Sequence, residues 1–174
     1  MVKLAENPTW RDKGVSCVDS FKKSVEKNYG EIDSVELTSN FLYKCSDENL
    51  ELLKSCKNIV LINGKMDENF GYAGNLTEQD KFMQDLKSAI QVAQKLGCKR
   101  VHMLSGLTTN GCSFEGLEEN LKSAMKVLPS DMIICLEIIS TIPNYLLRDY
   151  DKLIGFVESF SKTVLYLLYD FIFL

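Results

Sequence analysis

Histidine is almost absent from this sequence, which has one, His102, among 174 residues. A histidine-rich zinc cluster is therefore excluded, because such a site needs several imidazoles. No G-x-S-x-G segment accompanies the histidine, so the sequence does not indicate a serine hydrolase triad either.

The six cysteines include no C-x-x-C pair. Structural zinc sites use paired thiolates or sets of thiolates and imidazoles, and this spacing does not provide them. The first ten residues, MVKLAENPTW, contain no apolar segment typical of a secretory signal. We therefore expect reduced thiols and a cytoplasmic protein.

The sequence also lacks an apolar run of the about 20 residues that a membrane span needs. The strongly apolar stretch 164–174 is shorter and contains Asp170, which indicates a buried strand instead. The net charge is −4, and the densest basic cluster is only Lys95, Lys99 and Arg100. Because nucleic-acid-binding proteins display a concentrated basic face, we expect neither a nucleic acid nor a membrane as a partner.

Short apolar runs alternate with longer segments of helical spacing along the whole chain. Parallel strands need crossover connections, which are usually helices, so the alternation predicts an α/β fold with a parallel sheet in one domain. The runs have the length and composition of buried strands, and they are Val2–Ala5, Ile32–Leu37, Ile59–Ile62, Val101–Leu104, Met132–Leu136 and Val164–Tyr169.

The clearest helical pattern extends from about Glu78 to Leu96. Thr77 is its expected N-cap, with Asp80 three residues later, and Gly97 is its expected end. Weaker stripes are Val18, Phe21 and Val25; Leu50 and Leu53 after a Ser46 cap; Leu117, Leu121, Ala124 and Leu128 before Pro129; and Tyr150, Leu153, Ile154 and Val157.

Two architectures fit this alternation, a doubly wound open sheet and a (β/α)₈ barrel. A doubly wound sheet that binds a dinucleotide would have a glycine-rich turn after its first strand. The turn here is Asn7-Pro8-Thr9-Trp10 and contains no glycine. The pattern by itself leaves both architectures open.

Several segments together resemble the hydroxypyruvate isomerases, in the same order along the chain. They are KLAEN, IDSVEL, IVLIN, FGYAGNLTEQDKF, LGCKRVHMLSG, IICLE and LLYDFIFL. The resemblance implies a (β/α)₈ TIM barrel of the xylose isomerase-like type, with about six of the eight β/α units present in one incomplete domain, 1–174. Related barrels include sugar epimerases, xylose isomerase and endonuclease IV, of which the last relies on a histidine-rich zinc cluster.

The resemblance also implies a reaction, the interconversion of hydroxypyruvate and tartronate semialdehyde through an enediolate. Such a reaction needs a base near the carbon acid and an electrophile for the developing oxyanion. The family's electrophile is a divalent cation, Mg²⁺ or Mn²⁺, held by oxygen ligands. No organic cofactor is implied, and the substrate class is a small hydroxy-keto acid or sugar.

Two carboxylates are the main candidate site residues. Glu137 follows the apolar run 132–136 directly, and the mouth of a barrel lies at the C-terminal end of every strand. By resemblance Glu137 is the catalytic base and a metal ligand, and Asp170 on the sixth strand is a second metal ligand. The alternatives are a loop-capping role for Glu137 and a merely solvated Asp170.

Four further residues are candidate substrate contacts: Glu36, Asn63, His102 and Ser140. Loop-fixing hydrogen bonds explain Glu36 and Asn63 equally well. A strand places the side chain of His102 opposite to those of its neighbours Val101 and Met103, and a hydrogen-bonded core histidine is the alternative to a ligand.

The sequence departs from the family in two places. Ile138-Ile139-Ser140 stands where the family has Pro-Ile-Asn, and Phe173 occupies the position of a family histidine. A third and larger departure is that the family continues for two more β/α units, which bring further metal ligands and a second glutamate. A rival hypothesis is therefore a catalytically inactive barrel that acts as a binding module. Its first and sixth strands would be open edges, through which the chain could self-associate.

Overall fold

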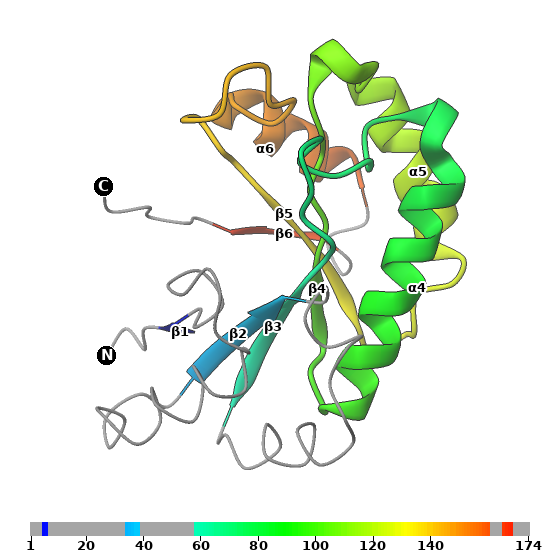
Figure 1. Cartoon of the computed structure of the whole chain (residues 1–174), viewed down its shortest axis with the longest axis vertical. Helices are drawn as coiled ribbons and strands as arrows, with labels where there is room; N and C mark the ends of the chain where they lie inside the picture. The colour runs from blue at the N-terminus through cyan, green and yellow to red at the C-terminus, as the bar shows by residue number, and fades with distance from the viewer. Residues whose placement is uncertain (1–4, 7–33, 39–57, 161–164, 169–174) are drawn as a thin grey trace.

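Six parallel strands form one sheet in the order β1-β2-β3-β4-β5-β6 in the computed structural model of this chain (Figure 1). The structure describes residues 5–6, 34–38, 58–160 and 165–168. Each strand pairs with the next along the chain, as in a barrel, whereas a doubly wound sheet reverses its strand order. The strands are β1 (Ala5–Glu6), β2 (Ser34–Thr38), β3 (Ile59–Asn63), β4 (Arg100–His102), β5 (Ile133–Glu137) and β6 (Leu165–Leu168).

Three helices and two short 3₁₀ turns connect the strands from β3 onward. Helices α4 and α5 lie side by side against one face of the sheet, and α6 precedes β6 (Figure 1). The elements are η2 (Leu76–Glu78), α4 (Gln79–Lys95), η3 (Thr108–Asn110), α5 (Phe114–Met125) and α6 (Tyr150–Ser159).

Helix α4 forms where the apolar spacing predicts it, with Phe82, Leu86 and Ile90 on its buried face. Gly97 follows its C-terminus with a φ of +70°, which confirms the predicted end. The predicted N-cap, Thr77, was wrong. The side chain of Asn75 accepts the Thr77 N–H at 2.9 Å, and the Thr77 hydroxyl donates to the same oxygen at 2.8 Å, so Asn75 caps the 3₁₀ turn before α4.

Helix α6 begins at Tyr150, after Asp149, whose carboxylate accepts the N–H of Lys152 at 3.1 Å. Leu153 is buried, as its place in the apolar stripe predicts. The prediction for Tyr150 was wrong, because its side chain is 43% exposed. Tyr150 is the first residue of the helix.

The hydrophobic core lies between the sheet and the helices. Alternate strand residues such as Leu37, Ile62 and Val101 point into it. The intervening strand residues lie on the other face, towards the barrel interior, because successive side chains of a strand point in opposite directions. Val101 and Met103 belong to the core, whereas the imidazole of His102 between them contacts Asn63 and Glu137, as the predicted opposite orientation requires.

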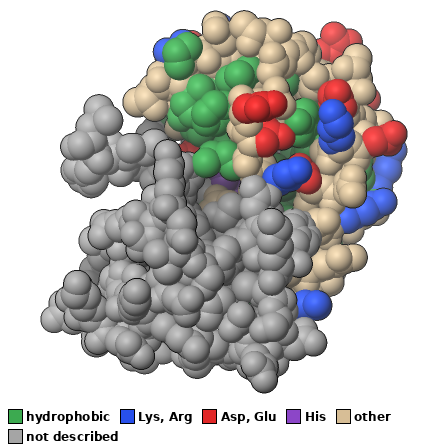
Figure 2. All heavy atoms as spheres, in the orientation of Figure 1, with side chains coloured by type: hydrophobic (Ala, Val, Ile, Leu, Met, Phe, Trp, Pro, Cys, Tyr) green, Lys and Arg blue, Asp and Glu red, His purple; other side chains and the backbone are tan. Residues whose placement is uncertain are grey.

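Predictions at several positions lie outside the described residues. They concern the stripe of Val18, Phe21 and Val25, the helix after Ser46, and Asp170 and Phe173. Within the described ranges, no helix has the length and apolar character needed to cross a bilayer. On the face drawn in Figure 2, basic and acidic side chains alternate beside a group of apolar ones.

Candidate functional site

The polar residues of the interior face are arranged in rows across the sheet. Asn63 of β3 pairs in register with His102 of β4, which pairs with Cys135 of β5. Residues in register on parallel strands face the same side, so these three side chains share the interior face. Glu137 lies two residues beyond Cys135 on the same face, closer to the C-terminal mouth of the sheet.

His102 is the centre of a buried polar group, with only 3% of its surface exposed. Its Nδ1 lies 2.7 Å from Oδ1 of Asn63, and its Nε2 lies 3.3 Å from Oε2 of Glu137. Glu137 is itself 8% exposed. The fold thus brings together three residues that the sequence identified on three separate strands.

Burial sets the protonation of two members of this face. It lowers the pKa of His102 to about 4, so the imidazole is neutral at pH 7. It raises the pKa of the Cys135 thiol to about 12, so the sulfur remains protonated and is a poor nucleophile. A neutral imidazole carries one proton, so it can donate either to the Asn63 oxygen that faces Nδ1 or to the Glu137 carboxylate that faces Nε2. It bridges both side chains when the Asn63 amide is turned so that its NH₂ group donates to Nδ1 and the ring donates from Nε2.

Tyr145, from the loop after β5, is buried close enough to Glu137 to feel its charge. Its hydroxyl accepts the N–H of Ser105 at 3.0 Å, and its side chain is 1% exposed. Burial raises the pKa of Tyr145 strongly, hydrogen bonding with Ser105 opposes this rise, and the nearby Glu137 carboxylate adds to it. Tyr145 is therefore a neutral phenol beside the carboxylate.

Backbone hydrogen bonds join the loops that follow β3, β4 and β5. Ala73 N–H donates to the Leu104 carbonyl at 3.2 Å, and Leu146 N–H donates to the Gly106 carbonyl at 2.9 Å. Gly71, with a φ of +90°, allows this approach, because a Cβ there would lie 2.3 Å from the Leu104 oxygen. Gly71 therefore shapes the loop after β3.

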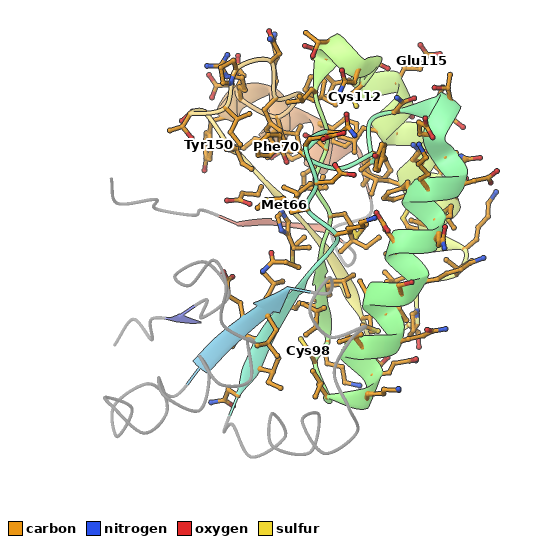
Figure 3. All side chains as sticks on the ribbon, in the orientation of Figure 1. Met66, Phe70, Cys98, Cys112, Glu115 and Tyr150 are labelled. Carbon is orange, nitrogen blue, oxygen red and sulfur yellow. The ribbon has the colours of Figure 1, made fainter. Side chains whose placement is uncertain are left out.

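Side chains from the first of these loops overhang the C-terminal end of the strands. Figure 3 shows Met66 and Phe70 near the upper ends of the strands, and Cys98 at the opposite end. Phe70 and Met66 are both half-buried. Both side chains pack against the hydrophobic core.

The other predicted site residues are less close to this group. Glu36 of β2 pairs in register with Leu61 of β3, and Thr38, the last residue of β2, pairs with Asn63. Glu36 therefore lies two residues further than Asn63 from the C-terminal mouth of the sheet. Ser140 is exposed in the loop after β5, where its carbonyl oxygen accepts a hydrogen bond from Arg148 at 2.9 Å. Asp170 lies outside the described residues.

Two residues of the site escaped the sequence reasoning, Tyr145 and Ser105. Tyr145 lies in a loop with no periodic pattern, so nothing in the sequence distinguishes it from an exposed loop tyrosine. Ser105 is fully buried next to Gly106. A small residue directly after an apolar strand was the one signal that could have drawn attention to it.

The donor atoms of the site fit a cation only in part. Glu137 and His102 are ligand types, but no three histidine, cysteine or acidic residues of the described ranges are close enough together to hold a metal ion. The carboxylate oxygens of Glu137 suit a hard cation such as Mg²⁺. Further ligands would have to come from other residues.

Comparison with known proteins gives the family. Residues 14–172 match the xylose isomerase-like TIM barrel family. A protein of Caenorhabditis elegans, named "Putative hydroxypyruvate isomerase", is 31% identical over 122 residues, which cover 64% of this chain and 47% of that protein. The chain thus spans about half the length of the curated relative that it matches.

Solved structures agree on the fold. A family 2 AP endonuclease of Brucella melitensis has a TM-score of 0.79 at 21% identity, over 96% of this chain and 67% of that one. A D-tagatose 3-epimerase-like protein has a TM-score of 0.73 at 15% identity, over 97% of this chain and 65% of that one. The ordered parallel strands, the outer helices and the match over residues 14–172 together show that this chain belongs to the xylose isomerase-like TIM barrel family.

Proposed function

We propose that this chain carries the proton-transfer site of an isomerase or epimerase that acts on a small hydroxy-carbonyl compound, with hydroxypyruvate as the preferred substrate. The observation that supports the proposal is the Glu137 carboxylate, which is almost completely buried at the C-terminal end of β5. In TIM barrels catalytic residues come from these strand ends.

Glu137 would act as the general base. Its carboxylate removes a proton from C3 of hydroxypyruvate, and the electron pair moves into an enediolate that spans C2 and C3. The same carboxylic acid then returns the proton to C2, while the proton of the C3 hydroxyl moves to the C2 oxygen, so that C3 becomes the aldehyde and C2 carries the hydroxyl of tartronate semialdehyde. A carboxylate within hydrogen-bond distance of both carbons is sufficient for this 1,2-transfer.

A divalent cation, Mg²⁺ or Mn²⁺, is part of the proposal, with Glu137 and Asp170 as ligands. The chemistry that it supplies when bound is stabilisation of negative charge on the enediolate oxygens. Support comes from the oxygen donors of these side chains and from a structural neighbour described as the IOLI protein with a binding zinc atom, which has a TM-score of 0.62.

Residues around the base would bind and enclose the substrate. Asn63 and Ser140 are proposed hydrogen-bonding partners of its hydroxyl and carbonyl groups, and Glu36 is a third. The apolar side chains of Met66 and Phe70 at the mouth would exclude water from the enediolate. Excluding water strengthens the electrostatic interactions within a site and protects a reactive intermediate.

The experiment is an assay of hydroxypyruvate isomerisation with added Mg²⁺ or Mn²⁺, comparing the chain with its Glu137→Gln variant. We expect loss of turnover by at least about 100-fold, because general base catalysis contributes roughly 10²–10⁴-fold. Glu158→Gln, at an exposed position on α6, is the matched control and should retain full turnover. Undiminished turnover in Glu137→Gln would refute the assignment.

A second substrate class is supported by the neighbours that are named as epimerases, including D-psicose 3-epimerase of Clostridium cellulolyticum H10, with a TM-score of 0.64. Epimerisation beside a carbonyl begins with the same proton removal. Incubation of ketohexoses and hydroxypyruvate in D₂O would detect this step as deuterium incorporation. Folded protein that exchanges no proton in either substrate would favour the inactive binding module.

A further inference from the structure

The geometry points to His102 as a positioning residue for the Glu137 carboxylate, while Asn63 contacts the other ring nitrogen and fixes the imidazole. This inference rests on the proposed function, in which Glu137 is the base. The three side chains form a chain across β3, β4 and β5, with contacts of 2.7 Å from Asn63 to the ring and 3.3 Å from the ring to Glu137.

Both ring nitrogens of His102 face protein groups. Nδ1 faces the Asn63 amide and Nε2 faces the carboxylate. The side chain is 3% exposed, and within the described part of the chain Nε2 makes no hydrogen bond, although the Glu137 carboxylate lies 3.3 Å from it. A histidine that bound the substrate would present one nitrogen to the mouth. This histidine instead acts through the residue beside it.

The consequence for Glu137 is a fixed orientation. The imidazole lies against Oε2 and so restricts rotation of the carboxylate about its last bond. Holding a reacting group in one geometry lowers the barrier by removing the need to order it during reaction. Nε2 and Oε2 are in close contact at 3.3 Å but do not form a hydrogen bond in this geometry. Catalytic hydrogen bonds of an unliganded site often tighten only when the substrate binds.

A spectroscopic test does not depend on turnover. The chain contains one histidine, so protein labelled with ¹⁵N-histidine gives the two ring nitrogens of His102 alone. In the wild-type chain we expect a single fixed tautomer at neutral pH. Glu137→Leu should shift the Nε2 signal more than the Nδ1 signal, and Asn63→Leu should do the reverse. Ser140→Ala, in the exposed loop after β5, should change neither.

A kinetic test separates positioning from substrate contact. In His102→Leu we expect kcat to fall by about 10- to 100-fold, as is typical when a residue that orients an active-site group is removed, while KM changes by less than about twofold. His102→Gln can still place an amide near Oε2 and should recover a part of the lost kcat. Thermal unfolding would confirm that each variant is folded.

The outcomes separate the two proposals. If Glu137→Leu leaves both nitrogen signals of a folded protein unchanged, the positioning role is refuted, whatever the activity. If KM rises and kcat is kept in His102→Leu, His102 contacts the substrate and the positioning role is also refuted. If the nitrogen signals respond as expected but the wild-type chain turns over no substrate, the positioning contact stands and the proposed function fails.

Discussion

Tyr145 is the largest of the fully buried side chains, and its hydroxyl is the acceptor for the Ser105 amide. Tyr145→Phe keeps the ring but leaves that buried N–H without a partner. We expect a loss of about 1–3 kcal/mol in the free energy of unfolding, measured by urea denaturation. Tyr150→Phe removes the same atom from an exposed side chain and should change stability by less than about 0.5 kcal/mol. Equal effects in the two variants would show that the Ser105 contact does not stabilise the fold.

His102 gives the stability of the protein a defined pH dependence. Its pKa is lowered by burial to about 4 in the folded chain, against about 6.5 in an unfolded one. Between these values the unfolded chain binds a proton that the folded chain does not, so the free energy of unfolding falls as the pH decreases from about 6.5 to 4. His102→Gln should show a shallower fall between pH 7 and pH 5. Parallel curves would contradict a neutral, buried imidazole.

At the scale of single residues, the sequence identified those whose chemistry is unusual for their position. Glu137 was predictable because a carboxylate directly after five apolar strand residues risks a costly loss of hydration unless it has a partner or a function. Asn63 and His102 were predictable as strand residues on one face. Their contact with one another was not, because register between strands 39 residues apart depends on packing that no local pattern records.

Among the connecting elements, the loop after β3 depends most on a single residue, Gly71. Gly71→Ala combines a left-handed φ with a Cβ placed 2.3 Å from the Leu104 oxygen, so we expect a loss of stability well above the about 1–2 kcal/mol of the conformation alone. Gly155→Ala in α6 is the matched control. It has open space around it and should stabilise the protein by about 0.5–1 kcal/mol. Thermal unfolding measures both, and a tolerated Gly71→Ala would mean that the loops separate easily.

Helices and strands followed the apolar periodicity closely, while their ends did not. The prediction of α4 was within one residue at each end, but the capping residue was wrong. Asn75 caps the 3₁₀ turn that precedes the helix, and its side chain also donates to the Asn110 carbonyl at 2.6 Å. That second contact is between loops, so the sequence around residue 77 could not reveal it.

At the scale of the whole molecule, β1 and β6 are the outer strands of the described sheet. Strands at the edge of a sheet expose backbone donors and acceptors that can pair with another chain. We expect the purified chain to self-associate, with a mass by light scattering that rises with protein concentration. A stable monomer over a wide concentration range would contradict this expectation and would leave the edges covered by other means.

Several hydrogen bonds between the loops after β3, β4 and β5 come from the backbone, and this has a consequence for how such a barrel diverges. Amides and carbonyls are common to every residue, so side chains around the mouth that take no part in loop contacts can be exchanged while these bonds keep the loops in place. A change of loop length disrupts these bonds, because it moves the N–H of Ala73 or Leu146 away from its partner carbonyl. New specificity would therefore be acquired by substitution within the existing loops, and a loop taken from a relative should be transplanted together with its two neighbours.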